Sequence, residues 1–383
     1  MQDIFNAVQS GSGLVRSAGG RSNHRNGRIL ARKGGPIKSH QNNSCWRPPE
    51  EWLTIETIEA HTAGEPLRVI VSGLPNIPGE TILAKRCWAQ THLDVLRQGL
   101  MWEPRGHADM YGAIMTEPVT NDGDLGVLFL HNAGFSTMCG HGVIALAKVA
   151  LDAGLIRKDG DSPEIRMDTP AGRVTAIGHR CGGAVQQVSF RNVSSFVLHS
   201  DATVRVPELG DVRLDVAFGG AFYAFCDAKV AGVPLAPESS NRLIEAGMQI
   251  KRAVQATLPI THPFAEDLGF LYGTIFTGPP RDPAHHSRNV CIFAEGEVDR
   301  SPTGTGVSAR AAIHHARGEL DLGETVTIES ILGTCMSVRV SEVTMCGPHP
   351  AVMPEVTGHA YITGESRFIF DPDDPLKEGF IIR

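Results

Sequence analysis

A single cysteine followed by glycines is the strongest candidate for chemistry in this sequence. Cys139 precedes Gly140, His141 and Gly142, and the apolar run 143–147 then favours a helix. A thiol at a helix N-terminus lies close to unpaired backbone N–H groups, which lower its pKa and favour the thiolate. The same N–H groups bind anions such as a carboxylate. The stretch therefore predicts a reactive thiolate beside a carboxylate site.

A second stretch, 301–311, aligns with the first without gaps when Thr303 is placed on Cys139. Five pairs of positions are then identical: Gly140 and Gly304, Gly142 and Gly306, Val143 and Val307, Ala145 and Ala309, and Ala147 and Ala311. A motif used twice indicates two similar halves whose helix starts face each other across a shared site. Chance similarity between two Gly- and Ala-rich helix starts is the alternative.

A thiolate in such a place could remove a proton from a carbon next to a carboxylate. A site between two domains excludes water, and the helix N-terminus stabilises both the base and the charge that develops on the carboxylate. We predict that no cofactor is required. The alternative for Cys139 is a buried structural cysteine, which is the common fate of a free thiol.

Four separated motifs together resemble the proline racemase family. They are HTAGEP at 61–66, EPRGH at 103–107, MCGHGVIA at 138–145 and SPTGTGVSA at 301–309. The resemblance implies an α+β fold of the diaminopimelate epimerase kind. Two pseudo-symmetric domains would each wrap a curved, mostly antiparallel sheet around a central helix, with the active site in the cleft between them. It also implies a homodimer, although nothing in the sequence identifies the interface.

The resemblance also implies roles for the residues that flank the two helix starts. Donors to a substrate carboxylate would come from both halves, namely Gly140, His141, Gly304 and Thr305. Asp299 would accept a hydrogen bond from the ring ammonium of an imino-acid substrate. The alternatives are helix-start geometry for the glycines, a structural hydrogen bond for His141 and a solvated turn for Asp299.

Thr303 departs from the family pattern and decides the predicted reaction. Racemases and epimerases of the family carry a second catalytic thiol at this position, whereas threonine resembles the trans-3-hydroxy-L-proline dehydratase branch. A threonine hydroxyl does not titrate in the working range, so a two-base reaction should fail. Elimination needs only one base. In trans-3-hydroxy-L-proline the α-hydrogen and the 3-hydroxyl lie on the same ring face, so Cys139 alone could remove the first and protonate the second, with Thr303 hydrogen-bonded to the hydroxyl.

We therefore predict a hydro-lyase that converts trans-3-hydroxy-L-proline to 1-pyrroline-2-carboxylate. A proline racemase or 4-hydroxyproline 2-epimerase is the alternative, but it would need a second thiol at the position of Thr303. An amino-acid-binding protein that lost catalysis is a third hypothesis, but binding alone does not need the thiol of Cys139. We predict no metal, because the candidate ligands lack a second pair at zinc spacing: His285, His286, His314, His315, Cys346 and His349.

The composition of the chain limits which binding partners and which cellular compartment can be expected. The chain has 383 residues, 42% hydrophobic and 20% charged, which suits a globular enzyme of two domains. A net charge of -7 gives no basic field for nucleic acid or an anionic membrane. No apolar run approaches the roughly 20 residues that span a bilayer. The eight cysteines are scattered without a disulfide-dense spacing, which favours a reducing, cytoplasmic compartment.

The chain divides into a leader and two domains. Residues 1–51 are basic, with Asp3 the single acid before Glu50, and are rich in Ser, Gly and Asn, which predicts disorder. A mitochondrial transit peptide is the alternative for this leader. The first domain, 52–198, carries the Cys139 helix and is completed by 358–383, and the second, 199–357, carries the Thr303 helix. Further helices are expected over 81–100 and 237–258.

Overall fold

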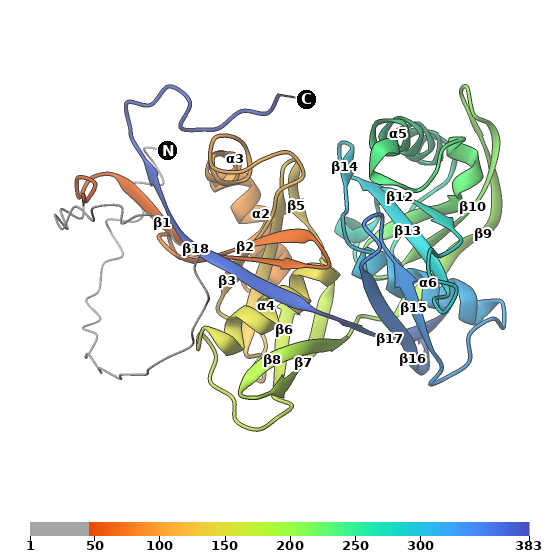
Figure 1. Ribbon diagram of the computed structural model, residues 1–383, viewed down its shortest axis with the longest axis horizontal. Helices are drawn as coiled ribbons and strands as arrows, with labels where there is room; N and C mark the ends of the chain where they lie inside the picture. The colour runs from red at the N-terminus through yellow and green to blue at the C-terminus, as the bar shows by residue number, and fades with distance from the viewer. Residues whose placement is uncertain (1–45, 383) are drawn as a thin grey trace, which may run out of the picture.

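The computed structural model describes residues 46–382, so most of the predicted leader lies outside the described residues. The described chain forms two α+β domains side by side, and the last strand returns from the second domain to pair with the first strand (Figure 1). This architecture confirms the predicted fold class. No helix among residues 46–382 is long and apolar enough to cross a membrane.

The first domain is a curved sheet that encloses one apolar helix. Neighbouring strands run in the order β18–β1–β2–β3–β4–β6–β7–β8, with parallel pairs only at β2–β3 and β4–β6. The enclosed helix is α4 (Gly140–Asp152), whose residues from 140 to 147 are all buried. The other elements are β1 (Leu53–Thr62), β2 (Glu65–Ser72), α2 (Ile82–His92), α3 (Asp94–Met101), β3 (Tyr111–Thr116), β4 (Leu125–His131), β5 (Gly134–Ser136), β6 (Glu164–Thr169), β7 (Gly172–Cys181), β8 (Ala184–Arg191) and β18 (Ala360–Phe370).

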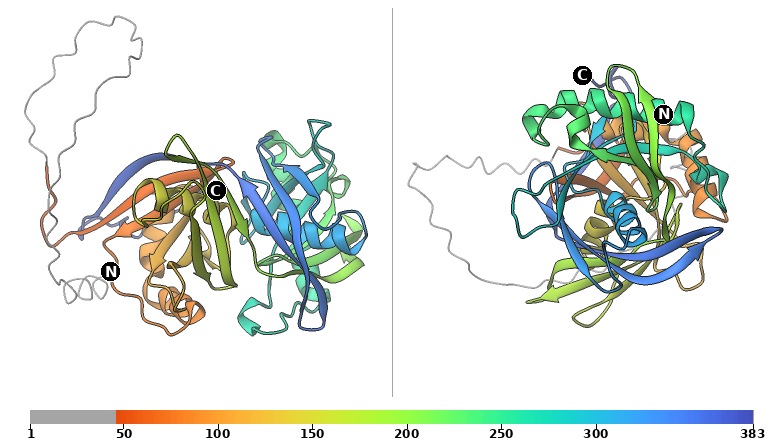
Figure 2. Two further views of the ribbon diagram at one scale, coloured as in Figure 1. Left: turned by 90° about the horizontal axis from the view of Figure 1, so that it is seen from below. Right: turned by 90° about the vertical axis from the view of Figure 1, so that its right-hand side faces the viewer.

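The second domain closes its strands into a ring around helix α6 (Gly304–Ala316), which the right-hand view of Figure 2 shows. The ring runs β9–β10–β11–β12–β13–β15–β16–β17 and returns to β9. Its strands are β9 (Ser195–Val206), β10 (Gly210–Phe218), β11 (Phe222–Asp227), β12 (Leu271–Gly278), β13 (Ser287–Phe293), β14 (Glu297–Val298), β15 (Thr325–Glu329), β16 (Cys335–Cys346) and β17 (His349–Gly358). Its other helices are α5 (Ser240–Thr257), η1 (Ala228–Ala231), η2 (Pro237–Ser239) and η3 (Glu266–Leu268).

The two domains repeat one plan. The parallel pairs β11–β12 and β13–β15 stand where β2–β3 and β4–β6 stand in the first domain. A short strand, β5 or β14, pairs back on β4 or β13 just before the buried helix. Helices α4 and α6 each have 13 residues. The internal duplication inferred from the two Gly-rich motifs is therefore present in the strand order.

Two predicted helices differ in detail from the structure. The helix expected over 81–100 is two helices, because the backbone leaves helical geometry at Leu93, which is buried. The helix expected over 237–258 begins as the 3₁₀ turn η2 and continues as α5. Strand β9 runs through the predicted domain boundary at 198, and that boundary stays a prediction.

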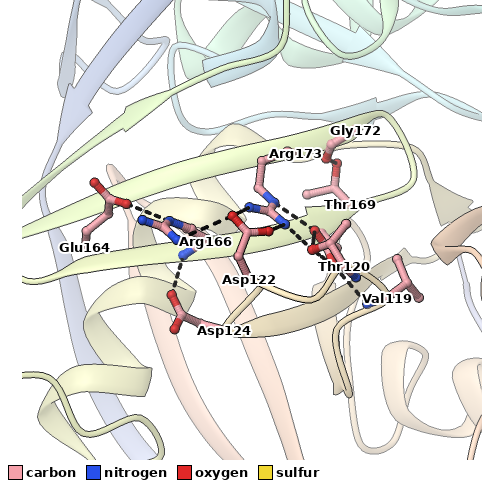
Figure 3. Close-up of polar contacts among 10 residues, drawn as sticks. Val119, Thr120, Asp122, Asp124, Glu164, Arg166, Thr169, Gly172 and Arg173 are labelled. Carbon is pink, nitrogen blue, oxygen red and sulfur yellow. Dashed lines mark hydrogen bonds and ion pairs between the residues drawn. The ribbon is translucent and has the colours of Figure 1, made fainter.

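A polar network holds together the part of the first domain that leads into α4. The buried carboxylate of Asp168 on β6 accepts hydrogen bonds from the N–H groups of Val119 (2.9 Å) and Thr120 (3.0 Å) and from Arg173 Nε (2.8 Å). Figure 3 shows how Arg173 also reaches Thr120 and the exposed Asp122. Burial alone would raise the pKa of Asp168, but the hydrogen bonds outweigh it and hold that pKa below its usual value. The network ties the segment before β4 to the β6–β7 hairpin.

Replacing Asp168 by asparagine should destabilise the protein by about 2–4 kcal/mol, because the buried donors lose a charged acceptor. Urea unfolding of the purified variant measures this. The matched control is Asp122→Asn, whose side chain is 64% exposed and bonded to the same arginine; it should leave stability nearly unchanged, because solvent screens an exposed ion pair. Equal effects from both substitutions would contradict the importance of the buried carboxylate.

Candidate active site

The N-termini of α4 and α6 meet at the interface between the domains. A Cβ atom added to Gly140 would lie 2.6 Å from Gly304 Cα, and one added to Gly304 would lie 2.7 Å from Gly140 Cα. Any side chain at either position would force the two backbones apart, so both must be glycine. The unpaired N–H groups of two helix starts are thereby brought to one place, which is a strong anion site.

A small buried cavity of about 20 Å³ surrounds this contact. The first domain lines it with Tyr111, Met138, Cys139, Gly140 and His141, and the second with Tyr223, Tyr272, Phe293, Asp299, Thr303, Gly304 and Thr305. All seven residues predicted for the site are thus brought together, while their roles stay predictions. A water molecule needs roughly 10–15 Å³. The cavity as it stands therefore has room for about one water molecule.

A larger hollow of about 940 Å³ lies on the second domain between η1 and α6 and includes Arg288 and Arg310. It contains none of the residues predicted for chemistry. Its two arginines already hydrogen-bond to protein groups, Arg288 to Glu329 and Arg310 to Ser287 and Asn289. We therefore place the site at the smaller cavity.

Cys139 is the N-cap of α4, as its position before the glycines predicted. Its Sγ accepts a hydrogen bond from the Gly142 N–H at 3.1 Å, which favours the thiolate. Burial is the larger effect and raises the pKa of the thiol well above its usual value, and the carboxyl groups of Asp299 and Glu65 raise it further. The low pKa expected from the helix start alone is therefore wrong. A substrate ammonium would add a positive charge nearby and favour the thiolate.

His141 lies beside the thiol but carries no charge. Its Nδ1 is 3.2 Å from Cys139 Sγ, and burial lowers the pKa of the imidazole to about 3. The ring hydrogen-bonds to the backbone of Pro66. A neutral imidazole cannot stabilise a thiolate by charge, although its one ring N–H can still donate a hydrogen bond.

Asp299 and Thr303 face Cys139 from the second domain. The Asp299 carboxyl accepts a hydrogen bond from the Ser301 N–H at 2.7 Å, and burial raises its pKa to about 6. At neutral pH it is therefore mainly a carboxylate that can accept from an ammonium group. Thr303 has a φ of 68°, which is rare for a β-branched residue and typical of functional positions.

The Thr303 hydroxyl is available to a ligand. It lies near the carboxyl of Asp299 and the thiol of Cys291 and helps to lower both pKa values. Its Oγ1 nevertheless makes no hydrogen bond of regular geometry to any residue that the structure describes, although it is buried. The hydroxyl can therefore make a further hydrogen bond to a group that enters the cavity.

Three tyrosines and one glutamate of the site were missed by the sequence analysis. Tyr111, Tyr223 and Tyr272 line the cavity and are three of only four tyrosines in the chain. Their scarcity is the only signal that the sequence offered. Glu65, from the HTAGEP stretch, is fully buried and accepts a hydrogen bond from the Arg300 N–H of the second domain at 2.8 Å. It fastens the segment that carries Asp299 to the first domain.

Known proteins match this chain over most of its length. The family model described as "Proline racemase" matches residues 57–381. The chain is 48% identical over 341 residues to a trans-3-hydroxy-L-proline dehydratase from Colwellia psychrerythraea, covering 88% of this chain and 96% of that protein. It is 44% identical over 330 residues to a 3-hydroxyproline 2-epimerase from Burkholderia multivorans, covering 86% and 98%.

A solved structure shows the same fold. A hydroxyproline epimerase from Agrobacterium vitis with bound trans-4-hydroxy-L-proline superposes with a TM-score of 0.82 at 30% sequence identity, covering 86% of this chain and 96% of that one. The chain therefore belongs to the proline racemase family.

The helix contact makes a direct prediction. Gly304→Ala should lower kcat/KM for the imino-acid substrate at least about 100-fold, because an added methyl group holds the two helix starts apart and misplaces the reacting groups. Steady-state kinetics measures the loss. Gly364→Ala is the control, since a Cβ at Gly364 would meet nothing within 4 Å, and it should leave kcat/KM unchanged. Full activity in Gly304→Ala would refute the close approach.

Proposed function

We propose that this chain dehydrates trans-3-hydroxy-L-proline to 1-pyrroline-2-carboxylate without a cofactor. The observation that carries the proposal is the pair Cys139 and Thr303 at the meeting point of the two helix starts. One side of the site offers a thiol that can act as a base, and the other offers a hydroxyl that does not titrate near neutral pH. The relatives named trans-3-hydroxy-L-proline dehydratase support the same reaction.

Substrate binding would supply the charges that the site lacks. The substrate carboxylate would sit at the helix N-termini, on the N–H groups around Gly140 and Gly304, and its ring ammonium would bind Asp299. The ammonium also lies close to Cys139 and so favours the thiolate that burial disfavours. Binding and activation of the base are then one event, and the enclosed cavity keeps water away from the thiolate.

Cys139 would then remove the α-proton. Negative charge develops on the substrate carboxylate and is stabilised by the N–H groups of both helices, which are already oriented before reaction. Loss of the 3-hydroxyl as water forms a double bond between the α- and β-carbons. The resulting enamine tautomerises to 1-pyrroline-2-carboxylate without further help.

Thr303 would prevent inversion. A reaction that inverts the α-carbon needs a group on the second face that delivers a proton, and a threonine hydroxyl can donate a hydrogen bond but does not give up its proton readily. An epimerase remains the second candidate, because a relative named 3-hydroxyproline 2-epimerase is 44% identical to this chain.

A homodimer and a cytoplasmic location stay predictions.

Incubation with trans-3-hydroxy-L-proline in D2O, without added metal or cofactor, should yield 1-pyrroline-2-carboxylate by NMR. In Cys139→Ala the rate should fall at least about 100-fold, because the base is gone. The control is Cys87→Ala, which removes an exposed thiol on α2 and should retain the wild-type rate. Inversion of the substrate by the wild-type protein, or full turnover by Cys139→Ala, would contradict the proposal.

The pH dependence should report Asp299. Because the raised pKa of its carboxyl is about 6, the carboxylate dominates above that pH and the neutral acid below it. We expect kcat/KM to fall as pH decreases through about 6, since the neutral acid no longer pairs with the ammonium. In Asp299→Asn this fall should disappear and KM should be high at every pH. A variant with the same pH profile as the wild type would show that another group titrates.

A further inference from the structure

Elimination from a 3-hydroxy imino acid needs an acid as well as a base. Hydroxide is a poor leaving group, since its conjugate acid water has a pKa of about 15.7. The α-hydrogen and the 3-hydroxyl of trans-3-hydroxy-L-proline lie on the same ring face. The group that protonates the departing oxygen must therefore lie on the same side of the substrate as Cys139, where the first domain supplies most of the wall.

The first domain offers few such groups. Of its five residues that line the cavity, Met138 and Gly140 have no acidic proton to give. His141 is held neutral, with a pKa of about 3, and its ring hydrogen-bonds to the Pro66 backbone. Thr303, Thr305 and Tyr223 come from the opposite domain, as does Tyr272, whose hydroxyl reaches the cavity beside that of Tyr111 and is hydrogen-bonded to it. Apart from Cys139 itself, Tyr111 remains.

Tyr111 is held rigidly with its hydroxyl in a hydrogen-bonded chain. Its hydroxyl lies 2.6 Å from Ser136 Oγ and 3.3 Å from the Tyr272 hydroxyl, so the chain crosses from one domain to the other. The ring meets His141 edge-on, with centroids 4.8 Å apart. The same hydroxyl is among the groups that lower the pKa of the Cys139 thiol by hydrogen bonding. Acid and base are thus neighbours on one wall of the cavity.

We propose that Tyr111 is the acid that protonates the departing 3-hydroxyl, an inference that rests on the proposed dehydration. The Cα–H bond breaks and its proton passes to the Cys139 thiolate. The electron pair forms the C2=C3 double bond as the C3–O bond breaks, and the departing oxygen takes the proton of the Tyr111 phenol to leave as water. The phenolate then takes the proton from the Cys139 thiol, which restores both groups.

The surroundings of Tyr111 suit this role. Ser136 and Tyr272 can each donate a hydrogen bond to the phenolate that forms during the step. Burial raises the pKa of the phenol well above its usual value, which by itself makes Tyr111 a weaker acid, but the hydrogen bonds with Ser136 and Tyr272 act in the opposite direction and would stabilise the phenolate as it forms. Thr303, on the other side of the substrate, is then left to bind the ring rather than to take part in water loss.

The test removes the hydroxyl of Tyr111 and changes the leaving group. Tyr111→Phe keeps the ring and its packing. It should lower kcat for trans-3-hydroxy-L-proline at least about 100-fold. With trans-3-fluoro-L-proline, fluoride needs no proton to depart, so Tyr111→Phe should release fluoride within about tenfold of the wild-type rate. The control Tyr361→Phe removes the hydroxyl of an exposed tyrosine outside the site and should match the wild type on both substrates.

Each other outcome overturns the inference. Unchanged water loss in Tyr111→Phe would mean that Cys139 itself returns the proton to the oxygen. An equal fall on the hydroxy and fluoro substrates would mean that Tyr111 orients or activates Cys139 and is not the acid. If the wild-type protein does not dehydrate trans-3-hydroxy-L-proline, the proposed function itself is wrong. The wild-type measurement therefore separates failure of the proposed function from failure of the role of Tyr111.

Discussion

The close contact between Gly140 and Gly304 is the constraint on which the rest of the structure depends. Two helix N-termini can share one site only if no side chain separates them, and the distances at both glycines leave no room for one. The duplicated plan of the domains supplies the two helices in matching places, each enclosed by its own strands. The contact thus explains the repeated motif, the buried cavity and the concentration of N–H donors at one point.

Burial at this contact sets the electrostatics of the site. It raises the pKa values of Cys139, Glu65 and Asp299 and lowers that of His141, so each of these groups is shifted towards its neutral form, and the Cys139 thiol most needs a compensating charge for the proposed chemistry. A zwitterionic imino acid carries one positive and one negative charge. In the proposed complex the ammonium binds Asp299 and the carboxylate binds the N–H groups at the two helix starts. The site would therefore become reactive only when the right substrate closes it, which links specificity to activation of the base.

Features that depend on a short stretch of sequence could be predicted. Residues that are brought together only by the folded chain could not. The helix starts at Cys139 and Thr303 were found because Gly-rich starts are local signals, whereas the three tyrosines lie on β3, β11 and β12, far apart in the chain and with no shared pattern. The sequence gives only a weak signal for strand β17, because Pro350 and Pro354 lower its strand propensity. The thiol pKa was misjudged because helix position can be read from sequence but burial by the second domain cannot.

The central claim is that the site holds one base and not two. Incubation of L-proline in D2O tests it without depending on a leaving group. The wild-type protein should place deuterium at the α-carbon of L-proline without forming D-proline, whereas Thr303→Cys, which restores a thiol on the second face, should form D-proline. D-proline produced by the wild-type protein as fast as deuterium enters would show that a second base stands opposite Cys139 and would contradict the account.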